Sequence, residues 1–171
     1  GSQVGLREII RATYPEKTVY LLGEMPSSLT YIGEMDEITQ EQFDASLIIV
    51  LDCANTPRID CPFEVDPSKV IKIDHHPDRD VYGAISFVDT NSSSTSEILC
   101  RFAFGEKSTW KVSKEAANAL YAGIVGDTGR FLYPATTAVT FAMVSKLLEF
   151  DVDISGIAYQ MITNPVSVSR L

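Results

Sequence analysis

Two apolar runs of strand length, each ending in an aspartate, most constrain the fold of this chain. They are SLIIVLD at residues 46–52 and VIKID at residues 70–74. Strands that are apolar on both faces are typical of a parallel sheet that is covered on each side. The sequence therefore predicts an α/β domain with a doubly wound, mainly parallel sheet and helices on both faces.

The rest of the chain supplies the other elements of such a domain. Short strands are predicted in TVYLL at residues 18–22 and in AISFVD at residues 84–89. Apolar residues at helical spacing predict a helix at residues 6–14, which ends before Pro15. Four more helices are predicted at residues 92–104, 113–127, 136–150 and 154–162.

The composition is that of a globular protein. Of the 171 residues, 45% are hydrophobic and 22% are charged, which argues against a disordered chain. No apolar run approaches the ~20 residues that cross a bilayer, and no pattern of basic, apolar and small residues marks a leader. The 3 cysteines have no CxxC spacing and are interpreted as reduced thiols. We therefore expect a cytoplasmic protein that makes no membrane contact.

The net charge limits the kind of partner. At −9, the chain is poorly suited to grip a long nucleic-acid backbone, because such binding depends on many Lys and Arg contacts. A small anionic substrate remains compatible with this charge. Clustered carboxylates can hold divalent cations, and the cations then supply the positive charge that an anion needs.

Both histidines of the chain directly follow one of the strand-ending acids. Asp74 is followed by His75 and His76, and Asp52 ends the earlier run. Ligands of open parallel sheets bind outside the carboxyl ends of the strands. If the two strands are neighbours, one rim of the sheet carries all four side chains. Taken singly, Asp52 could instead cap a helix, and the histidines could be hydrogen-bonded loop residues.

A third acid, Asp127, lies in GIVGDTGRF, a segment in which glycines leave room for a ligand near the backbone. Asp127 taken alone could simply end its helix. Imidazole together with carboxylate favours a divalent metal such as Mn²⁺, Fe²⁺, Co²⁺ or Zn²⁺. Arg130, just after the turn, either donates to a phosphate or forms a surface ion pair.

Three motifs in this order resemble the DHH phosphoesterase superfamily. They are LDCAN, then IDHHP, then GIVGDTGRF, and the resemblance in order and spacing covers essentially the whole chain. The chain is most similar to the bacterial oligoribonuclease and pAp-phosphatase branch, also called nanoRNases. The resemblance implies an α/β fold and a hydrolase that cleaves phosphoester bonds with two Mn²⁺ ions, which activate water.

The resemblance also implies a role for each site residue. Asp52 would bridge the two Mn²⁺ ions, and His75 and Asp127 would be further ligands of the pair. His76 would face the substrate phosphate, and Asp74 would orient the histidines without binding the metal itself. A bridging carboxylate suits two metals about 3.5–4 Å apart that bind a nucleophile and a phosphoryl oxygen between them. An acid that accepts a hydrogen bond from a histidine ring fixes the tautomer of that ring.

The family pattern extends beyond both ends of this sequence. Its first motif, a His and an Asp-x-Asp that lead into Ala, Leu or Ile, Gly and Ser, would precede residue 1, where the chain reads GSQVGL. A smaller substrate-binding domain would follow. We therefore interpret residues 1–165 as an N-terminally incomplete DHH catalytic domain and residues 166–171 as the start of a connector.

The implied substrates are very short oligoribonucleotides and 3′-phosphoadenosine 5′-phosphate (pAp). Two other activities within the superfamily stay open: an inorganic pyrophosphatase and a cyclic-dinucleotide phosphodiesterase. A non-catalytic module that binds a nucleotide or a metal is the alternative from another class. The sequence does not decide the oligomeric state, and a homodimer is one option.

We expect residues 1–171 by themselves to have little or no phosphoesterase activity, because roughly half of the protein ligands for two cations lie outside them on the family pattern. A sensitive Mn²⁺-dependent assay on pAp and on a dinucleotide checks this. Turnover equal to that of the longer protein, and abolished by Asp52→Ala, would contradict it.

Overall fold

The structure, a computed structural model, describes residues 1–164. Within them, three strands form one parallel sheet in the order β1-β2-β3. The strands are β1 (Ile49–Leu51), β2 (Ile71–Asp74) and β3 (Ile85–Val88). Leu51 pairs with Ile73, and Asp74 pairs with Val88. The predicted parallel sheet is confirmed, and the proposed connector at residues 166–171 lies outside the described residues.

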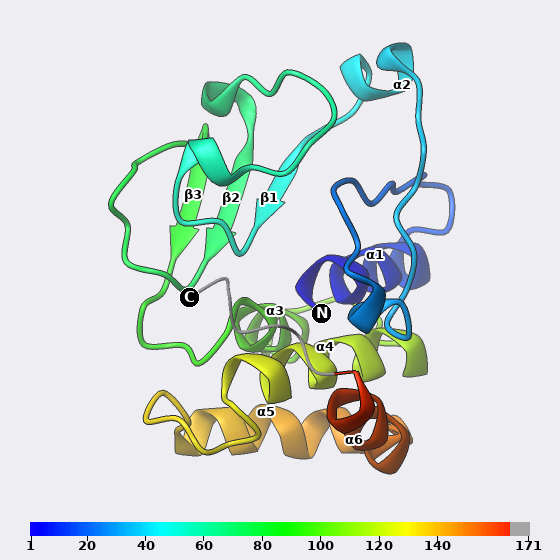
Figure 1. Ribbon diagram of the computed structural model, residues 1–171, viewed down its shortest axis with the longest axis vertical. Coiled ribbons are helices and arrows are strands. Elements are labelled where there is room, and N and C mark those ends of the chain that lie inside the picture. Colours follow the sequence, from blue (N-terminus) through cyan, green and yellow to red (C-terminus); the bar gives the residue numbers. More distant parts are fainter. Residues whose placement is uncertain (165–171) are drawn as a thin grey trace.

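Residues 1–164 contain six α-helices. In the view of Figure 1, α2 lies above the sheet and the others lie below and beside it, with α5 and α6 at the bottom. Helix α3 contacts β2, and α4 packs against α1, α3 and α5. The helices are α1 (Ser2–Thr13), α2 (Gln40–Asp44), α3 (Thr95–Ala103), α4 (Lys114–Asp127), α5 (Ala138–Leu148) and α6 (Ile154–Thr163). Short 3₁₀ helices η1 (Ser27–Leu29), η2 (Thr56–Arg58) and η3 (Pro67–Lys69) complete the set.

Alternate residues of the strands bury opposite faces of the sheet. Ile49, Leu51, Ile71 and Ile73 pack into the main core, which α1, α3, α4, α5 and α6 complete with residues such as Ile9, Ile98, Leu120, Val144 and Ile157. Val50 and Val70 point the other way and form a second cluster with Tyr82 and with loop residues such as Ile59. Both faces are therefore covered, as the α/β class requires.

The two faces are covered by different kinds of structure. Helices α1 and α3–α6 cover the face that forms the main core, whereas the second face is covered by the loops between β1 and β3, in which the only helices are the 3₁₀ helices η2 and η3. The α/β class is confirmed. Among the described residues, the helical cover on the second face is reduced to these short turns. This side of the sheet is thus built mostly of loop, and it holds both loops that follow β1 and β2.

The predicted strand at residues 18–22 is wrong, since this segment has no strand partner among the described residues. Its backbone groups bond elsewhere. The Leu21 amide donates to Asp36 Oδ2 at 2.8 Å, and the Asp36 amide donates to the Leu21 carbonyl at 2.7 Å. The β-branched and aromatic composition suited a strand, but a side-chain carboxylate and a loop satisfy the peptide groups here instead.

The predicted helices are present, with caps that explain where they begin. Ser94, Ser113 and Thr137 accept hydrogen bonds from the backbone amides that start α3, α4 and α5. A side-chain acceptor at this position offsets an otherwise unpaired amide and contributes about 1 kcal/mol. Helix α1 begins at Ser2, earlier than the sequence predicts. No helix in residues 1–164 is both long and apolar enough to cross a membrane.

We expect Leu120→Ala to lower the free energy of unfolding by about 3 kcal/mol, because its fully buried side chain joins α4 to α1 and leaves a cavity when truncated. Leu148→Ala is the matched control in α5, where the leucine is 40% exposed, and it should cost less than about 1 kcal/mol. Urea unfolding of both variants checks this. Equal losses would show that α4 is not central to the core.

Candidate metal centre

Parallel pairing of β1 with β2 places Asp52 beside the residues that follow β2. The Asp52 amide donates to the Ile73 carbonyl at 3.1 Å, which extends the ladder by one residue. Asp52 Oδ1 then lies 3.5 Å from His75 Nε2 and 3.7 Å from His76 Nδ1. The sheet rim predicted from the sequence is therefore formed by Asp52, Asp74, His75 and His76.

Asp52 sits in a tight turn at the end of β1. Its φ of 60° is left-handed, a conformation that aspartate adopts more readily than most residues because its side chain bonds locally. Thr95 Oγ1, at the start of α3, donates to Asp52 Oδ1 at 3.0 Å. The carboxylate is thus aimed at the histidines by a backbone turn and by a hydroxyl from a helix N-terminus.

Asp74 is a buried carboxylate that organises both histidines. It is fully shielded from solvent, and its Oδ1 accepts from the amides of His75 and His76 at 2.8 and 3.2 Å and lies 2.8 Å from His76 Nδ1. Burial alone would raise the pKa of Asp74, but these hydrogen bonds outweigh it and the pKa is lowered. Asp74 is therefore an anion that holds the loop and the His76 ring.

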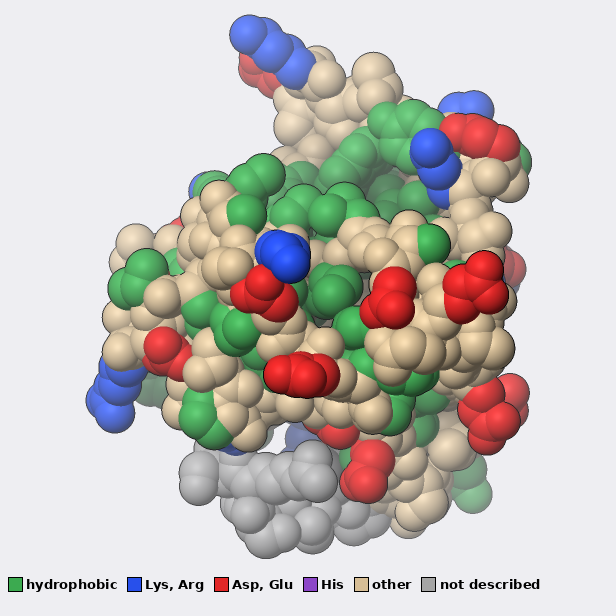
Figure 2. All heavy atoms as spheres, turned by 90° about the horizontal axis from the view of Figure 1, so that it is seen from above, with side chains coloured by type: hydrophobic (Ala, Val, Ile, Leu, Met, Phe, Trp, Pro, Cys, Tyr) green, Lys and Arg blue, Asp and Glu red, His purple; other side chains and the backbone are tan. Residues whose placement is uncertain are grey.

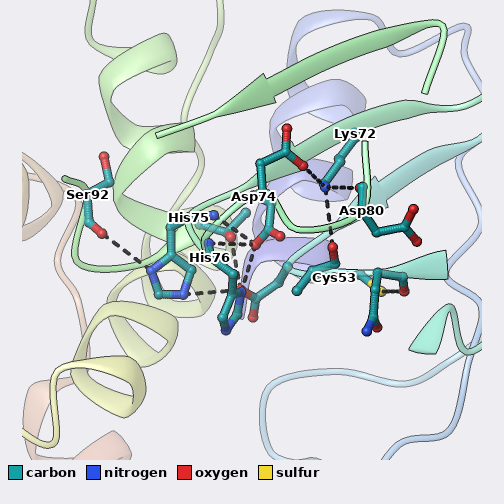
Figure 3. A network of polar contacts seen from close by, with 12 residues as sticks. Cys53, Lys72, Asp74, His75, His76, Asp80 and Ser92 are labelled. Atoms are coloured by element: carbon teal, nitrogen blue, oxygen red, sulfur yellow. Dashed lines mark hydrogen bonds and ion pairs between the residues drawn. The ribbon is translucent and has the colours of Figure 1, made fainter. Parts of the chain in front are cut away.

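The ring of His75 is oriented by a different partner. His75 Nδ1 lies 3.3 Å from the Ser92 carbonyl. A carbonyl can only accept, so Nδ1 is the nitrogen that donates here, and Nε2 is left 3.5 Å from Asp52 Oδ1. A histidine anchored in this way through one nitrogen offers the other to a metal. Figure 3 shows Ser92 and His75 on one side of the site and Asp74 beside the His76 ring.

His76 is also anchored through Nδ1, but its partner is a carboxylate. Its Nδ1 donates to Asp74 Oδ1 at 2.8 Å, which leaves Nε2 free of this anchor. The hydrogen bond to Asp74 raises the pKa of His76, burial opposes this, and the charge of Asp52 adds to the rise. The two imidazole centroids lie 4.4 Å apart, so both rings border the same small volume.

Asp127, the last residue of α4, lies near this rim but outside its tightest group. Desolvation by the surrounding protein raises the pKa of Asp127, and the charge of Asp52 raises it further while His76 opposes, although the residue keeps solvent contact. Arg130 follows in an exposed left-handed turn with φ 61°. The structure thus brings Asp127 within electrostatic range of Asp52, and it leaves Arg130 on the surface.

Possible metal-ligand atoms of Asp52, His75 and His76 lie close together; Asp52 and His75 Nε2 are placed to bind an ion, whereas His76 Nδ1 is engaged by Asp74. One such atom from each lies within 4.8 Å of the others, and a carboxylate with imidazoles is a donor set that suits first-row divalent ions. The described cysteines lie outside this group, so the set lacks the thiolates typical of structural zinc sites.

Sequence reasoning missed the supporting residues Ser92, Thr95 and Lys72. Ser92 lies just before α3 and Thr95 is its first residue; the sequence favours helix capping for this hydroxyl-rich segment over binding of a phosphate, and neither interpretation predicts contacts with His75 or Asp52. The entire segment Ser92–Glu97 is buried. A polar run with no exposed member is unusual, but its burial cannot be read from the sequence. Lys72 lies in a strand pattern where a lysine ordinarily faces solvent.

The family model of the DHH family N-terminal domain matches residues 1–124 of this chain. The chain is 48% identical over 171 residues to a probable bifunctional oligoribonuclease and PAP phosphatase NrnA of Streptococcus mutans. It is 41% identical over 172 residues to the bifunctional oligoribonuclease and PAP phosphatase NrnA of Bacillus subtilis. The alignments cover all of this chain and 54% and 55% of those proteins, so the chain spans about half their length.

Solved structures share the same fold. An exopolyphosphatase-related protein from Bacteroides fragilis superposes with a TM-score of 0.77 at 24% identity, over 97% of this chain and 53% of that one. A putative family II inorganic pyrophosphatase from Methanococcus jannaschii gives 0.65 at 19% identity, over 94% and 56%. With the family match over most of its length and the DHH motif on the rim of a parallel sheet, the chain belongs to the DHH family.

Proposed function

We propose that this chain is the metal-binding catalytic part of a phosphoesterase that hydrolyses short oligoribonucleotides and pAp. The observation that carries the proposal is the group formed by Asp52, His75 and His76 at the carboxyl ends of β1 and β2. The substrates are taken from the names of the 48% and 41% identical relatives. The motif order LDCAN, IDHHP, GIVGDTGRF supports the same branch of the family.

Mn²⁺ is the proposed cofactor, with two ions in the whole protein. Asp52 and His75 would hold it, and Asp127 would complete the set from the end of α4. The orientation of His75 favours this role, because the Ser92 carbonyl engages Nδ1 and leaves Nε2 3.5 Å from Asp52 Oδ1. Such ions activate water at neutral pH and neutralise the charge of a phosphate. Their positive charge would offset the repulsion between an anionic substrate and a protein whose net charge is −9.

The remaining rim residues would act on the substrate and on the rings. Asp74 stabilises the protonated form of His76 through its contact with Nδ1. Protonated His76 would then donate from Nε2 to a phosphate oxygen, where negative charge develops during cleavage. Asp74 never needs to touch the substrate in this scheme, because its buried position allows it to act only through the loop and the ring.

The charge distribution supports a short substrate. In the view of Figure 2, a face on which no histidine is visible, the Lys and Arg side chains of the described residues lie in separate small groups, most of them next to acidic side chains. A protein that follows a long nucleic acid needs a connected basic surface. A mono- or dinucleotide needs only its phosphate to be held at the metal centre.

We expect Asp52→Asn to lower kcat on pAp at least about 100-fold in the full-length protein, because it removes the anionic oxygen at the centre of the group. Asparagine tolerates the left-handed turn, so the fold should persist. Asp44→Asn, at an exposed acid on α2, is the control and should leave kcat unchanged. Wild-type turnover by folded Asp52→Asn would refute the proposed site.

The substrate class is tested by assaying the full-length protein on several phosphoesters with Mn²⁺. We expect turnover of pAp and of a diribonucleotide to exceed that of pyrophosphate and of a cyclic dinucleotide at least about 10-fold in kcat/KM, a difference of about 1.4 kcal/mol. Preferential pyrophosphate cleavage would instead favour the pyrophosphatase alternative. Calorimetric binding of Mn²⁺ and pAp without turnover would identify a non-catalytic binding module.

A further inference from the structure

Lys72 is a buried lysine in the middle of β2, on the face of the sheet opposite the α-helices. Its side chain is 0% exposed, and it projects to the same side as Val50 and Val70. Burying an ammonium group costs several kcal/mol unless its donors are fully paired. A valine or isoleucine at this position of the strand would avoid that cost, so the lysine needs a compensating interaction.

The partners of Lys72 come from two loops. Its Nζ donates to Asp78 Oδ1 at 2.8 Å, to the Asp80 carbonyl at 3.2 Å and to the Ala54 carbonyl at 3.5 Å. The Tyr82 ring lies 4.4 Å from Nζ. An ammonium group has three N–H donors, and three oxygens surround this one.

These loops are the ones that carry the metal group. Ala54 lies two residues after Asp52, and Asp78 lies two residues after His76. Figure 3 shows Lys72 between Asp80 and the turn that contains Cys53, next to Asp74 and the histidines. Lys72 therefore connects the chain just beyond Asp52 to the chain just beyond His76.

Further hydrogen bonds reinforce the same connection. Tyr82 Oη donates to the Cys53 carbonyl at 2.7 Å. Asp80 Oδ2 accepts from the Thr56 amide and hydroxyl at 2.7 and 2.8 Å. Each bond joins the loop after β1 to the loop after β2, and Lys72 lies at their centre with contacts to both sides.

We propose that Lys72 is a positioning residue for the metal group, which holds the Asp52 carboxylate opposite the two imidazoles by fastening the two loops together. Asp52 adopts a left-handed backbone, which aspartate tolerates at low cost, but the direction of its side chain still depends on how the flanking chain is held. The Ala54 carbonyl is held by Lys72 on one side of this turn. The inference rests on the proposed function only in treating this group as the metal site.

The experiment uses the chain of residues 1–171, in which His75 and His76 are the only histidines. Their imidazole ¹H–¹⁵N NMR signals therefore report on the site without any metal. Lys72→Met keeps the length of the side chain and removes the three donors. We expect the sharp imidazole signals of the unaltered chain to become doubled or broadened, because the loops exchange between conformations.

Lys69→Met is the matched control. Lys69 lies three residues earlier, its side chain is 78% exposed, and it pairs with Asp66. This variant should leave both imidazole signals sharp. We also expect Lys72→Met to weaken Mn²⁺ binding about 10- to 100-fold, as is common for residues that orient metal ligands, while Lys69→Met leaves binding unchanged.

A folded Lys72→Met chain that retains one sharp signal set from each imidazole would overturn the inference, even if the variant is less stable. If Lys72→Met does not fold, Asp78→Asn decides, since Asp78 is the carboxylate paired with Nζ and is one-third exposed. Doubled signals in Asp78→Asn support the inference, and unchanged signals overturn it. These outcomes do not depend on pAp hydrolysis, so failure of the proposed activity is seen separately in the substrate assay.

Discussion

The parallel pairing of β1 with β2 is the interaction on which the site depends. It sets Leu51 beside Ile73, so the first residue after β1 meets the first residues after β2. A shift of one residue in this register would turn Asp52 to the other face of the sheet. The main core prevents such a shift, because Ile49, Leu51, Ile71 and Ile73 pack together against the α-helices.

The rim is organised by groups that would not themselves touch a ligand. Asp74 binds the amides of the DHH loop and the His76 ring through a single oxygen. The Ser92 carbonyl sets the His75 tautomer, and Ser92 is in turn held by Asp89 and Arg101. Because buried hydrogen bonds in low dielectric are strong and costly to break, the rings are presented in fixed orientations before any ligand arrives.

The sequence predicted much of this arrangement, and its errors have physical causes. The strands that end in Asp52 and Asp74 were predictable because both are continuous apolar runs, and the gathering of Asp52, His75 and His76 followed from parallel topology. The strand predicted at residues 18–22 does not form, because the Asp36 carboxylate accepts the hydrogen bond of the Leu21 amide, and the sequence pattern gave no sign of this contact. The roles of Ser92, Thr95 and Lys72 depend on contacts between distant segments, which no local pattern contains.

The left-handed turn at the end of β1 restricts which acid can occupy position 52. Aspartate is among the few residues that adopt such a backbone at low cost, and its short side chain places Oδ1 between Thr95 and the histidines. A glutamate would carry the same charge but would lack the backbone preference and would extend past the hydroxyl. The turn therefore distinguishes two acids that carry the same charge. Glutamate at position 52 would be unsuitable because of its backbone preference and side-chain length.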